Sequence, residues 1–251
     1  MSEIIWKDII VSPCETFHLL NEKPLYSQRY THVMKFHEPG LAPVKSEVHA
    51  FHIDVEGRPA YFNRYIETFG FYEGLAAVIN EEGWFHVNTE GTPIYLERYG
   101  WCGNFQEHNC PVKDKITDLY FHINRDGQKI YQKQYRYVGD FKDGSAVVCN
   151  ELGLHTHIDP QGNPLHNCWF RDLDVYHKGY ARAQDEQGWF HINKQGIPIY
   201  KSRYQQVEPF YNGLARVKTF EGDLVIINTA DDTMAQLSSP PASCLPIEHF
   251  I

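Results

Sequence analysis

Apolar and polar residues alternate along most of the chain in short segments, each closed by a turn. Phe190–Asn193 (Phe-His-Ile-Asn) is typical, because aromatic and β-branched side chains alternate there with polar ones, as in a strand with two different faces. Asn or Asp followed two or three residues later by Gly, and then by Pro, predicts a hairpin and the start of a further strand. No window shows a sustained helical period, so the pattern predicts an all-β fold with almost no helix.

The strand pattern recurs with a period of about 35 residues. After each tetrad come Gly-x-Pro-Ile-Tyr-x-x-Arg-Tyr and then Phe-x-x-Gly-x-Ala-x-Val, with conservative changes. The tetrad histidine recurs in steps of 34, 34, 36, 35, 34 and 35 residues, at His18, His52, His86, His122, His157, His191 and, in the same column, Ile226. One such unit cannot bury its apolar face alone, so the units must stack or close into a ring.

The two ends of the repeat region favour a ring. Residues 1–16 have the pattern of the back half of a unit, and residues 224–236 that of a front half. Pairing of the N- and C-terminal strands would seal a β-propeller of about seven blades, or six if one end fails to pair; an open solenoid is the alternative. We predict one domain, 1–236, with units beginning near residues 17, 51, 85, 121, 156, 190 and 225. A Pro/Ser linker and a short apolar tail follow at 237–251.

The repeat resembles the WG-repeat family of bacterial proteins, named for a Trp-Gly-type signature in units of this length. The resemblance rests on Gly83-Trp84-Phe85, on Gly188-Trp189-Phe190 and on the Phe-x-x-Gly-x-Ala-x-Val segments, and it covers roughly residues 17–236. It implies β-propeller-like arrays that serve in binding or as accessory domains. It implies no shared catalytic residues.

Two repeated columns carry side chains suited to ligands. In a ring, the histidines would line a channel and bind an anion or a metal ion. An arginine before a tyrosine suits carboxylate, phosphate or sugar recognition. Both columns also have a structural interpretation, as hydrogen bonds and stacking between blades, and this one is favoured because a repeat column reflects repeat packing first. The candidate ligand-binding residues are His52, His86, His122, His157, His191, Arg29, Arg64, Arg98 and Arg203.

The unit at 154–188 departs most from the repeat. Histidine replaces its Trp and Tyr columns, so that His155, His157, His166 and Cys168 fall on either side of one tight turn. If residue 157 lies opposite 166, these four side chains share a face and suit zinc or iron. A register shifted by one residue puts His166 and Cys168 on the other face, and the Asp-x-x-Gly turn tends toward that register. No other cofactor is predicted.

Composition narrows the class of partner. The chain has 23 Lys+Arg against 32 Asp+Glu, a net charge of −9, which argues against a nucleic-acid or anionic-membrane binder. No apolar run is long enough for a membrane span and no secretory signal is evident. The six cysteines form no Cys-x-x-Cys pair and do not recur with the repeat, so reduced thiols and a cytoplasmic location are expected.

These features favour a non-catalytic module that engages a protein, a peptide or a small polar ligand. We find no Gly-rich phosphate loop, no nucleophile elbow and no His-Glu-x-x-His. The alternative is a metal-dependent enzyme, or an accessory protein of an enzyme, that uses the unit at 154–188. Asp172, Asp174 and His177 suit acid–base chemistry, but an ordinary polar loop is the favoured interpretation of this cluster.

Overall fold

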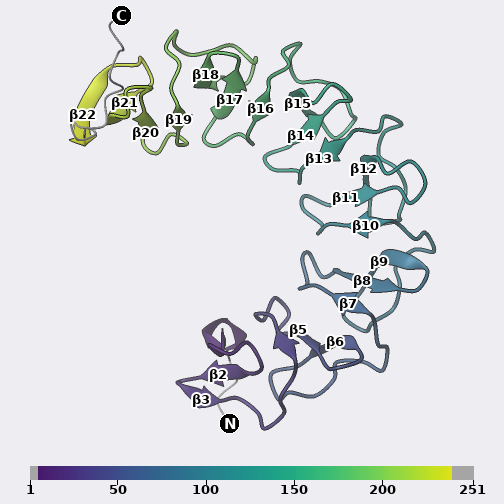
Figure 1. Ribbon diagram of the computed structural model, residues 1–251. Coiled ribbons are helices and arrows are strands. Elements are labelled where there is room, and N and C mark those ends of the chain that lie inside the picture. Colours follow the sequence, from purple (N-terminus) through teal and green to yellow (C-terminus); the bar gives the residue numbers. More distant parts are fainter. Residues whose placement is uncertain (1–4, 239–251) are drawn as a thin grey trace, which may run out of the picture. The chain divides into compact units, whose positions relative to one another are not determined.

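The computed structural model describes residues 5–238, and these form short antiparallel strands (Figure 1). Seven sheets follow one another along the described chain, and the only helical element in it is one 3-10 turn, η1 (Trp6–Asp8). The prediction of an all-β fold almost without helix is confirmed. The chain divides into two compact units, one up to Phe141 and one from Lys142 onward.

The first unit contains four complete sheets in the strand orders β1-β2-β3, β4-β5-β6, β7-β8-β9 and β10-β11-β12, followed by β13. The strands are β1 (Ile10–Val11), β2 (His18–Leu20), β3 (Lys23–Pro24), β4 (His32–Val33), β5 (Ala42–Lys45), β6 (Ala50–Ile53), β7 (Glu67–Thr68), β8 (Ala76–Asn80), β9 (Gly83–Val87), β10 (Trp101–Cys102), β11 (Cys110–Lys113), β12 (Tyr120–Ile123) and β13 (Tyr137–Val138).

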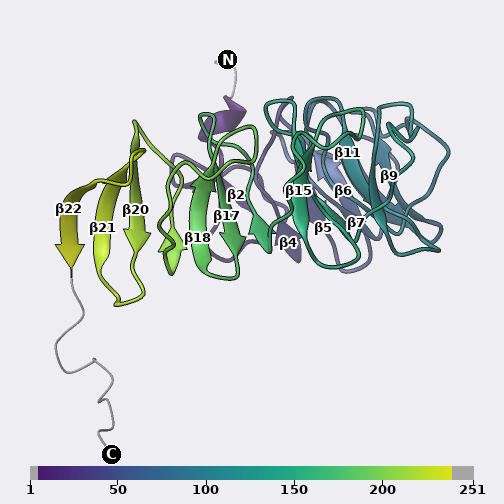
Figure 2. The same ribbon diagram turned by 90° about the horizontal axis from the view of Figure 1, so that it is seen from above.

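The second unit continues the series, and its last sheet has four strands in the order β19-β20-β21-β22. The strands are β14 (Ala146–Cys149), β15 (His155–Ile158), β16 (Asp172–Leu173), β17 (Ala181–Asp185), β18 (Gly188–Ile192), β19 (Gln206–Val207), β20 (Leu214–Lys218), β21 (Leu224–Asn228) and β22 (Thr233–Ser238). Figure 2 shows β20, β21 and β22 side by side.

The sequence forms each sheet through local hairpins. The middle strand β8 pairs with β7 before it and with β9 after it. The tetrad of β9 then runs into a turn in which the Asn88 side-chain oxygen accepts the backbone N–H groups of Glu90 (3.2 Å) and Thr92 (2.8 Å). Gly91 has a φ of +74° there, a conformation that glycine adopts without strain. The predicted hairpin chemistry is confirmed in this repeat.

The outer edge of a typical sheet is a loop that meets the sheet at two points. After β9 the chain forms isolated bridges at Val87↔Pro93 and Trp84↔Tyr99, and it leaves the sheet between them. Proline lacks an N–H, which suits it to such an edge. The last sheet differs, because the six-residue strand β22 pairs with β21 there, with two register shifts.

The two ends of the described chain complete their own sheets. β1 pairs with β2, and β22 pairs with β21. Closure of a ring by pairing of the chain ends therefore stays a prediction, and so does the number of blades. The apolar tail predicted at 237–251 lies, from residue 239 on, outside the described residues.

The repeated apolar positions form the core. In β9 the tetrad residues Phe85 and Val87 are buried, and so is the small residue Ala76 in β8. The tetrad histidine between the two apolar residues is buried as well, with His86 wholly inaccessible. Both faces of these strands are therefore packed, and the histidine column does not line an open surface.

Candidate functional site

The six tetrad histidines make the same pair of hydrogen bonds in almost every repeat. In His86 the Nε2 atom donates to the carbonyl oxygen of Gly103 at 3.0 Å, so the neutral ring accepts at Nδ1 the hydroxyl of Tyr95 at 2.5 Å. Five repeats have this His–Tyr bridge: His18 with Tyr26, His52 with Tyr61, His86 with Tyr95, His122 with Tyr131, and His191 with Tyr200. Each bridge fixes a tetrad strand to the turn after it and to the first strand of the following sheet.

Burial holds these histidines neutral. It lowers the pKa of His52, His86 and His191 to about 4, and the carbonyl bond at Nε2 opposes this shift only in part. Both ring nitrogens are bonded and the rings have no exposed surface to offer. Ligand binding by this column stays a prediction, and a ligand would have to replace one of the two bonds.

One repeat carries a different bridge. His157 donates from Nε2 to the carbonyl oxygen of Asp174 at 2.9 Å, and its Nδ1 lies 3.1 Å from Nε2 of His166. Since Nδ1 of His157 must accept, Nε2 of His166 carries the proton and its own Nδ1 is left as an acceptor. That atom is buried and has no hydrogen-bond partner among the described residues. The His157–His166 bridge is therefore incomplete where the His–Tyr bridge is complete.

The structure brings together two of the four predicted metal ligands. Ile158 forms a bridge with Pro164, and the N–H of Leu165 donates to the carbonyl oxygen of His157. His157 therefore lies opposite Leu165, not opposite His166, and the register is shifted by one residue from the one that a shared face requires. His155 instead places Nδ1 3.0 Å from the carbonyl oxygen of Arg171. Cys168 packs against the apolar cluster of the second unit. Within residues 5–238, no three His, Cys, Asp or Glu side chains gather in reach of one metal ion.

The arginine column closes the outer loops. In Arg64 one terminal nitrogen, Nη1, donates to three successive carbonyl oxygens, those of Tyr61, Phe62 and Asn63, at 2.8–2.9 Å. Its guanidinium lies over the tetrad ring of Phe51, 4.1 Å from the centroid. The same stacking on the tetrad phenylalanine recurs at Arg29, Arg98 and Arg203. The arginine therefore stacks on the tetrad phenylalanine of its own repeat rather than between blades, and the hydrogen bonds tie it to its own loop.

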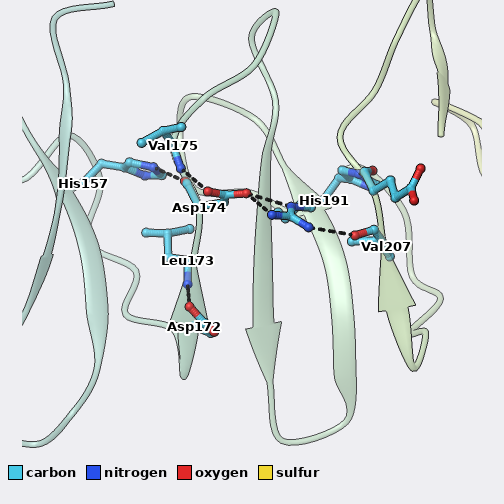
Figure 3. Close-up of polar contacts among 9 residues, drawn as sticks. His157, Asp172, Leu173, Asp174, Val175, His191 and Val207 are labelled. Carbon is cyan, nitrogen blue, oxygen red and sulfur yellow. Dashed lines mark hydrogen bonds and ion pairs between the residues drawn. The ribbon is translucent and has the colours of Figure 1, made fainter. Parts of the chain in front are cut away.

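The polar loop around Asp174 is occupied by internal contacts (Figure 3). The Asp174 carboxylate accepts Nε of Arg182 at 2.7 Å and pairs also with Nη2, while Nη1 of Arg182 donates to the carbonyl oxygen of Val207 at 3.2 Å. Asp172 accepts the N–H of Leu173 at 2.8 Å. These bonds link three strands of the second unit, as expected of a structural polar loop.

A pocket of about 880 Å³ opens on the first unit. Phe36 and Phe71, both buried, belong to its lining, and Trp6 contributes from the 3-10 turn. His37 and Tyr72 stand beside them with ring centroids 4.8 Å apart. The volume lies in the range of small-molecule sites, which are aromatic pockets with a few polar groups.

Charged groups stand around this pocket. The Glu73 carboxylate is already bonded, since it accepts the N–H of His108 at 3.1 Å and lies 3.6 Å from Nη2 of Arg125. Lys7 lies over the Trp6 ring, 5.4 Å from its centroid. Burial and the positive charge of Lys35 lower the pKa of His37, so its ring is neutral at neutral pH and presents both a donor and an acceptor.

This pocket was not predicted from the sequence. Its aromatic pair lies at the second position of the Phe-x-x-Gly turn, a position that packing of the repeat does not prescribe. The residue there is His37, Tyr72, Gln106, Lys142, His177 or Tyr211 in successive repeats. This variation is the signal in the sequence that could have indicated the pocket. A repeat position whose residue varies is not constrained by packing, so its side chain is available to bind a ligand.

Seven antiparallel sheets in succession, built from a short recurring repeat, define a propeller-like all-β repeat protein. The WG containing repeat family matches the chain at residues 122–151 and 189–219. The family model thus matches two stretches of the chain, and the resemblance of its sequence to the WG repeat is confirmed. Among curated proteins, no sequence matches this chain. The described residues include no helix long and apolar enough to cross a membrane.

Solved structures share the fold at low identity. The computationally designed Ika8 protein has a TM-score of 0.54 at 9% identity, with 92% of this chain and 84% of that chain covered. A eukaryotic initiation factor has a TM-score of 0.52 at 11% identity, with 92% and 69% covered. The WD40 beta propeller domain of Doa1 has a TM-score of 0.40 at 12% identity, with 88% and 82% covered. The first two show the fold alone.

Proposed function

We propose that this protein is a non-catalytic binding module whose first unit takes a small polar ligand, or an aromatic side chain of a peptide, in the pocket beside Trp6, His37 and Tyr72. The observation that carries the proposal is the contrast between this pocket and the repeat columns. The repeated His and Arg side chains make internal bonds, whereas the pocket presents aromatic walls and charged groups to solvent. An interaction module agrees with the repeat and with the propeller-like fold.

Titration with aromatic probes tests this proposal. N-acetyltyrosinamide and indole-3-acetate should shift the NMR signals of the Trp6 indole and the His37 ring. Tyr72→Ala should weaken binding at least tenfold, because it removes one wall of the pocket. Trp101→Phe is the matched control, since Trp101 lies in the same unit but outside the lining. The proposal fails if neither probe shifts these signals, or if Tyr72→Ala binds the probes as the parent protein does.

We propose in addition that the sheets close into a ring of seven blades. The seven sheets support that number of blades. A compact ring of this length has a radius of gyration of about 18 Å. Small-angle X-ray scattering in solution measures it. A value well above this, with an elongated distance distribution, would favour the open solenoid.

A further inference from the structure

The pocket beside Trp6 presents two lysines that the described part of the chain does not neutralise. Lys7 and Lys35 both belong to its lining, and both are exposed. None of the ion pairs formed within residues 5–238 includes either lysine. Their ammonium groups are therefore available to a ligand in this pocket.

The lining also contains two carboxylates, and one of them is already compensated. Glu73 accepts the backbone N–H of His108 at 3.1 Å and lies 3.6 Å from Nη2 of Arg125, and its side chain is only 28% exposed. Glu38 is exposed and takes part in no ion pair of the described residues. With Glu73 set against Arg125, the pocket has two positive charges and one negative charge.

The His37 ring shows which of these charges dominates beside the aromatic pair. Burial lowers the pKa of His37, and the positive charge of Lys35 lowers it further. Neither Glu38 nor Glu73 is among the groups that shift this pKa, although both line the same pocket. The charge that acts on the His37 ring is therefore positive.

Each lysine is placed next to an aromatic wall of the pocket. Lys35 directly precedes the buried ring of Phe36, and Lys7 directly follows Trp6 and lies over its indole, 5.4 Å from the centroid. Tyr72 completes the wall. Aromatic walls favour an apolar ring, and a few charged groups fix its orientation, as in other small-molecule sites.

We propose that the ligand of this pocket is an aromatic anion, whose ring lies against Trp6 and Tyr72 and whose carboxylate is bound by Lys7 and Lys35. This inference rests on the proposed function, because it uses the same pocket. Lysine binds an oxyanion as a point charge and prescribes no bidentate geometry. The same chemistry is found in a free aromatic acid and in the C-terminal residue of a peptide that ends in phenylalanine or tyrosine.

Three probes with one ring and different charge test the proposal in the intact protein. Indole-3-acetate is an anion, indole-3-acetamide is neutral and tryptamine is a cation, and the NMR signals of Trp6 and His37 measure their binding. Indole-3-acetate should bind about tenfold more tightly than the amide, and tryptamine should bind most weakly. Equal affinities, or tighter binding of tryptamine, would overturn the inference and leave the proposed function standing. Binding of none of the three would remove both.

Two peptides identify the source of the carboxylate. Acetyl-Ala-Ala-Phe with a free C-terminus carries the anion, and the same peptide with a C-terminal amide is its neutral match. Tighter binding of the free peptide than of indole-3-acetate assigns the site to the end of a protein chain, and weaker binding assigns it to a free acid. In either case the amidated peptide should bind less tightly than the free one, and the reverse order contradicts the proposal.

Substitution of the lysine separates its charge from its packing. Lys35→Met should weaken indole-3-acetate about fivefold and leave indole-3-acetamide unchanged, because it removes a charge and keeps an unbranched side chain. Glu38→Gln should strengthen indole-3-acetate. Lys133→Met is the control, since Lys133 is an exposed lysine of the first unit outside the lining. Unchanged binding of the anion in Lys35→Met, or an equal loss for the amide, would show that the charge of Lys35 does not select the ligand.

The second unit supplies an internal comparison for the titration. His177 and Tyr211 form the same kind of ring pair there, with centroids 4.7 Å apart and a tilt of 50°, against 4.8 Å and 52° for His37 and Tyr72. Val175 stands in the position of Lys35, two residues before the histidine. The His177 signals should stay in place at probe concentrations that saturate His37. An equal response at His177 would mean that the ring pair alone binds the probes, and the role given to the lysines would be wrong.

Discussion

The His86 and His157 repeats solve the same packing problem with different side chains. In the first, Tyr95 donates its hydroxyl to His86 and no polar atom of that bridge is left unpaired. In the second, His166 takes the place of the tyrosine, donates from Nε2, and buries an acceptor that nothing satisfies. The scaffold therefore tolerates a histidine at this position, but the incomplete bridge gives a weaker contact than the tyrosine does.

The comparison also shows what the histidine column is for. Each tetrad histidine is held neutral so that it can accept at one nitrogen and donate at the other, and a proton added at Nδ1 would remove the acceptor. The bridge thus depends on burial and on neutrality together. Four predictions test this dependence. They are ordered by the size of the expected effect on stability, from the whole histidine column to a single hydrogen bond.

Acid should destabilise the protein through the whole column at once. The folded pKa of His52, His86, His122, His157 and His191 is lowered to about 4, whereas histidine in an unfolded chain titrates near 6.5. Between these values the unfolded chain binds more protons, so the free energy of unfolding falls as the pH falls from about 6.5 to about 4. Urea unfolding at a series of pH values measures this, and a flat profile over that window would contradict it.

Truncating one complete bridge should cost most among single substitutions. His86→Ala removes a wholly buried ring, leaves a cavity and unpairs both the Tyr95 hydroxyl and the Gly103 carbonyl. We expect a loss of about 3–5 kcal/mol in the free energy of unfolding. An exposed histidine substituted in the same unit, His108→Ala, is the control and should cost less than about 1 kcal/mol.

Removing the donor should separate the two kinds of bridge. Tyr131→Phe leaves Nδ1 of His122 unpaired at a cost of about 1–3 kcal/mol. His166→Phe unpairs Nδ1 of His157 in the same way, but it also removes the unsatisfied Nδ1 of His166, so its cost should be smaller. Equal losses measured by denaturant unfolding would mean that the His157–His166 bridge is as complete as the others.

Restoring the tyrosine should stabilise the protein slightly. His166→Tyr replaces the incomplete bridge by the common one and removes a buried unsatisfied acceptor. The ring of the new tyrosine fits a space that the repeat already provides, since Gly196 lies against the His166 ring as Gly91 lies against the Tyr61 ring. We expect a gain of about 1 kcal/mol, or a Tm about 2–4 °C higher. A lower Tm would indicate that His166 has a partner that the bridge alone does not explain.

The fold was predictable because repetition leaves few choices. Recurrence of the tetrad, of Asn88 with Gly91 and of Pro93 prescribes strand, turn and edge in each unit. The burial of the histidine was not predictable from alternation, which places it on the face opposite Phe85 but cannot say that this face is also covered. Both faces are packed because repeats pack on either side of a sheet, which no single unit reveals.

The sites were less predictable, because they depend on contacts between distant positions. Trp6 and Tyr72 line the same pocket although they lie 66 positions apart in the sequence. The departure at 154–188 was correctly singled out, but the side chain of His166 reaches His157 through a register that the turn sets and the spacing does not show.

The tautomer and charge of the tetrad histidines test the central claim, that this column bonds the sheets internally and that ligands bind elsewhere. Long-range ¹H–¹⁵N NMR spectra of the histidine rings at pH 6 measure both properties. The account predicts neutral rings with the proton on Nε2 for His52, His86, His122, His157 and His191, unchanged when a ligand of the Trp6 pocket is added. Charged rings at that pH, or rings whose signals shift as the ligand binds, would contradict it.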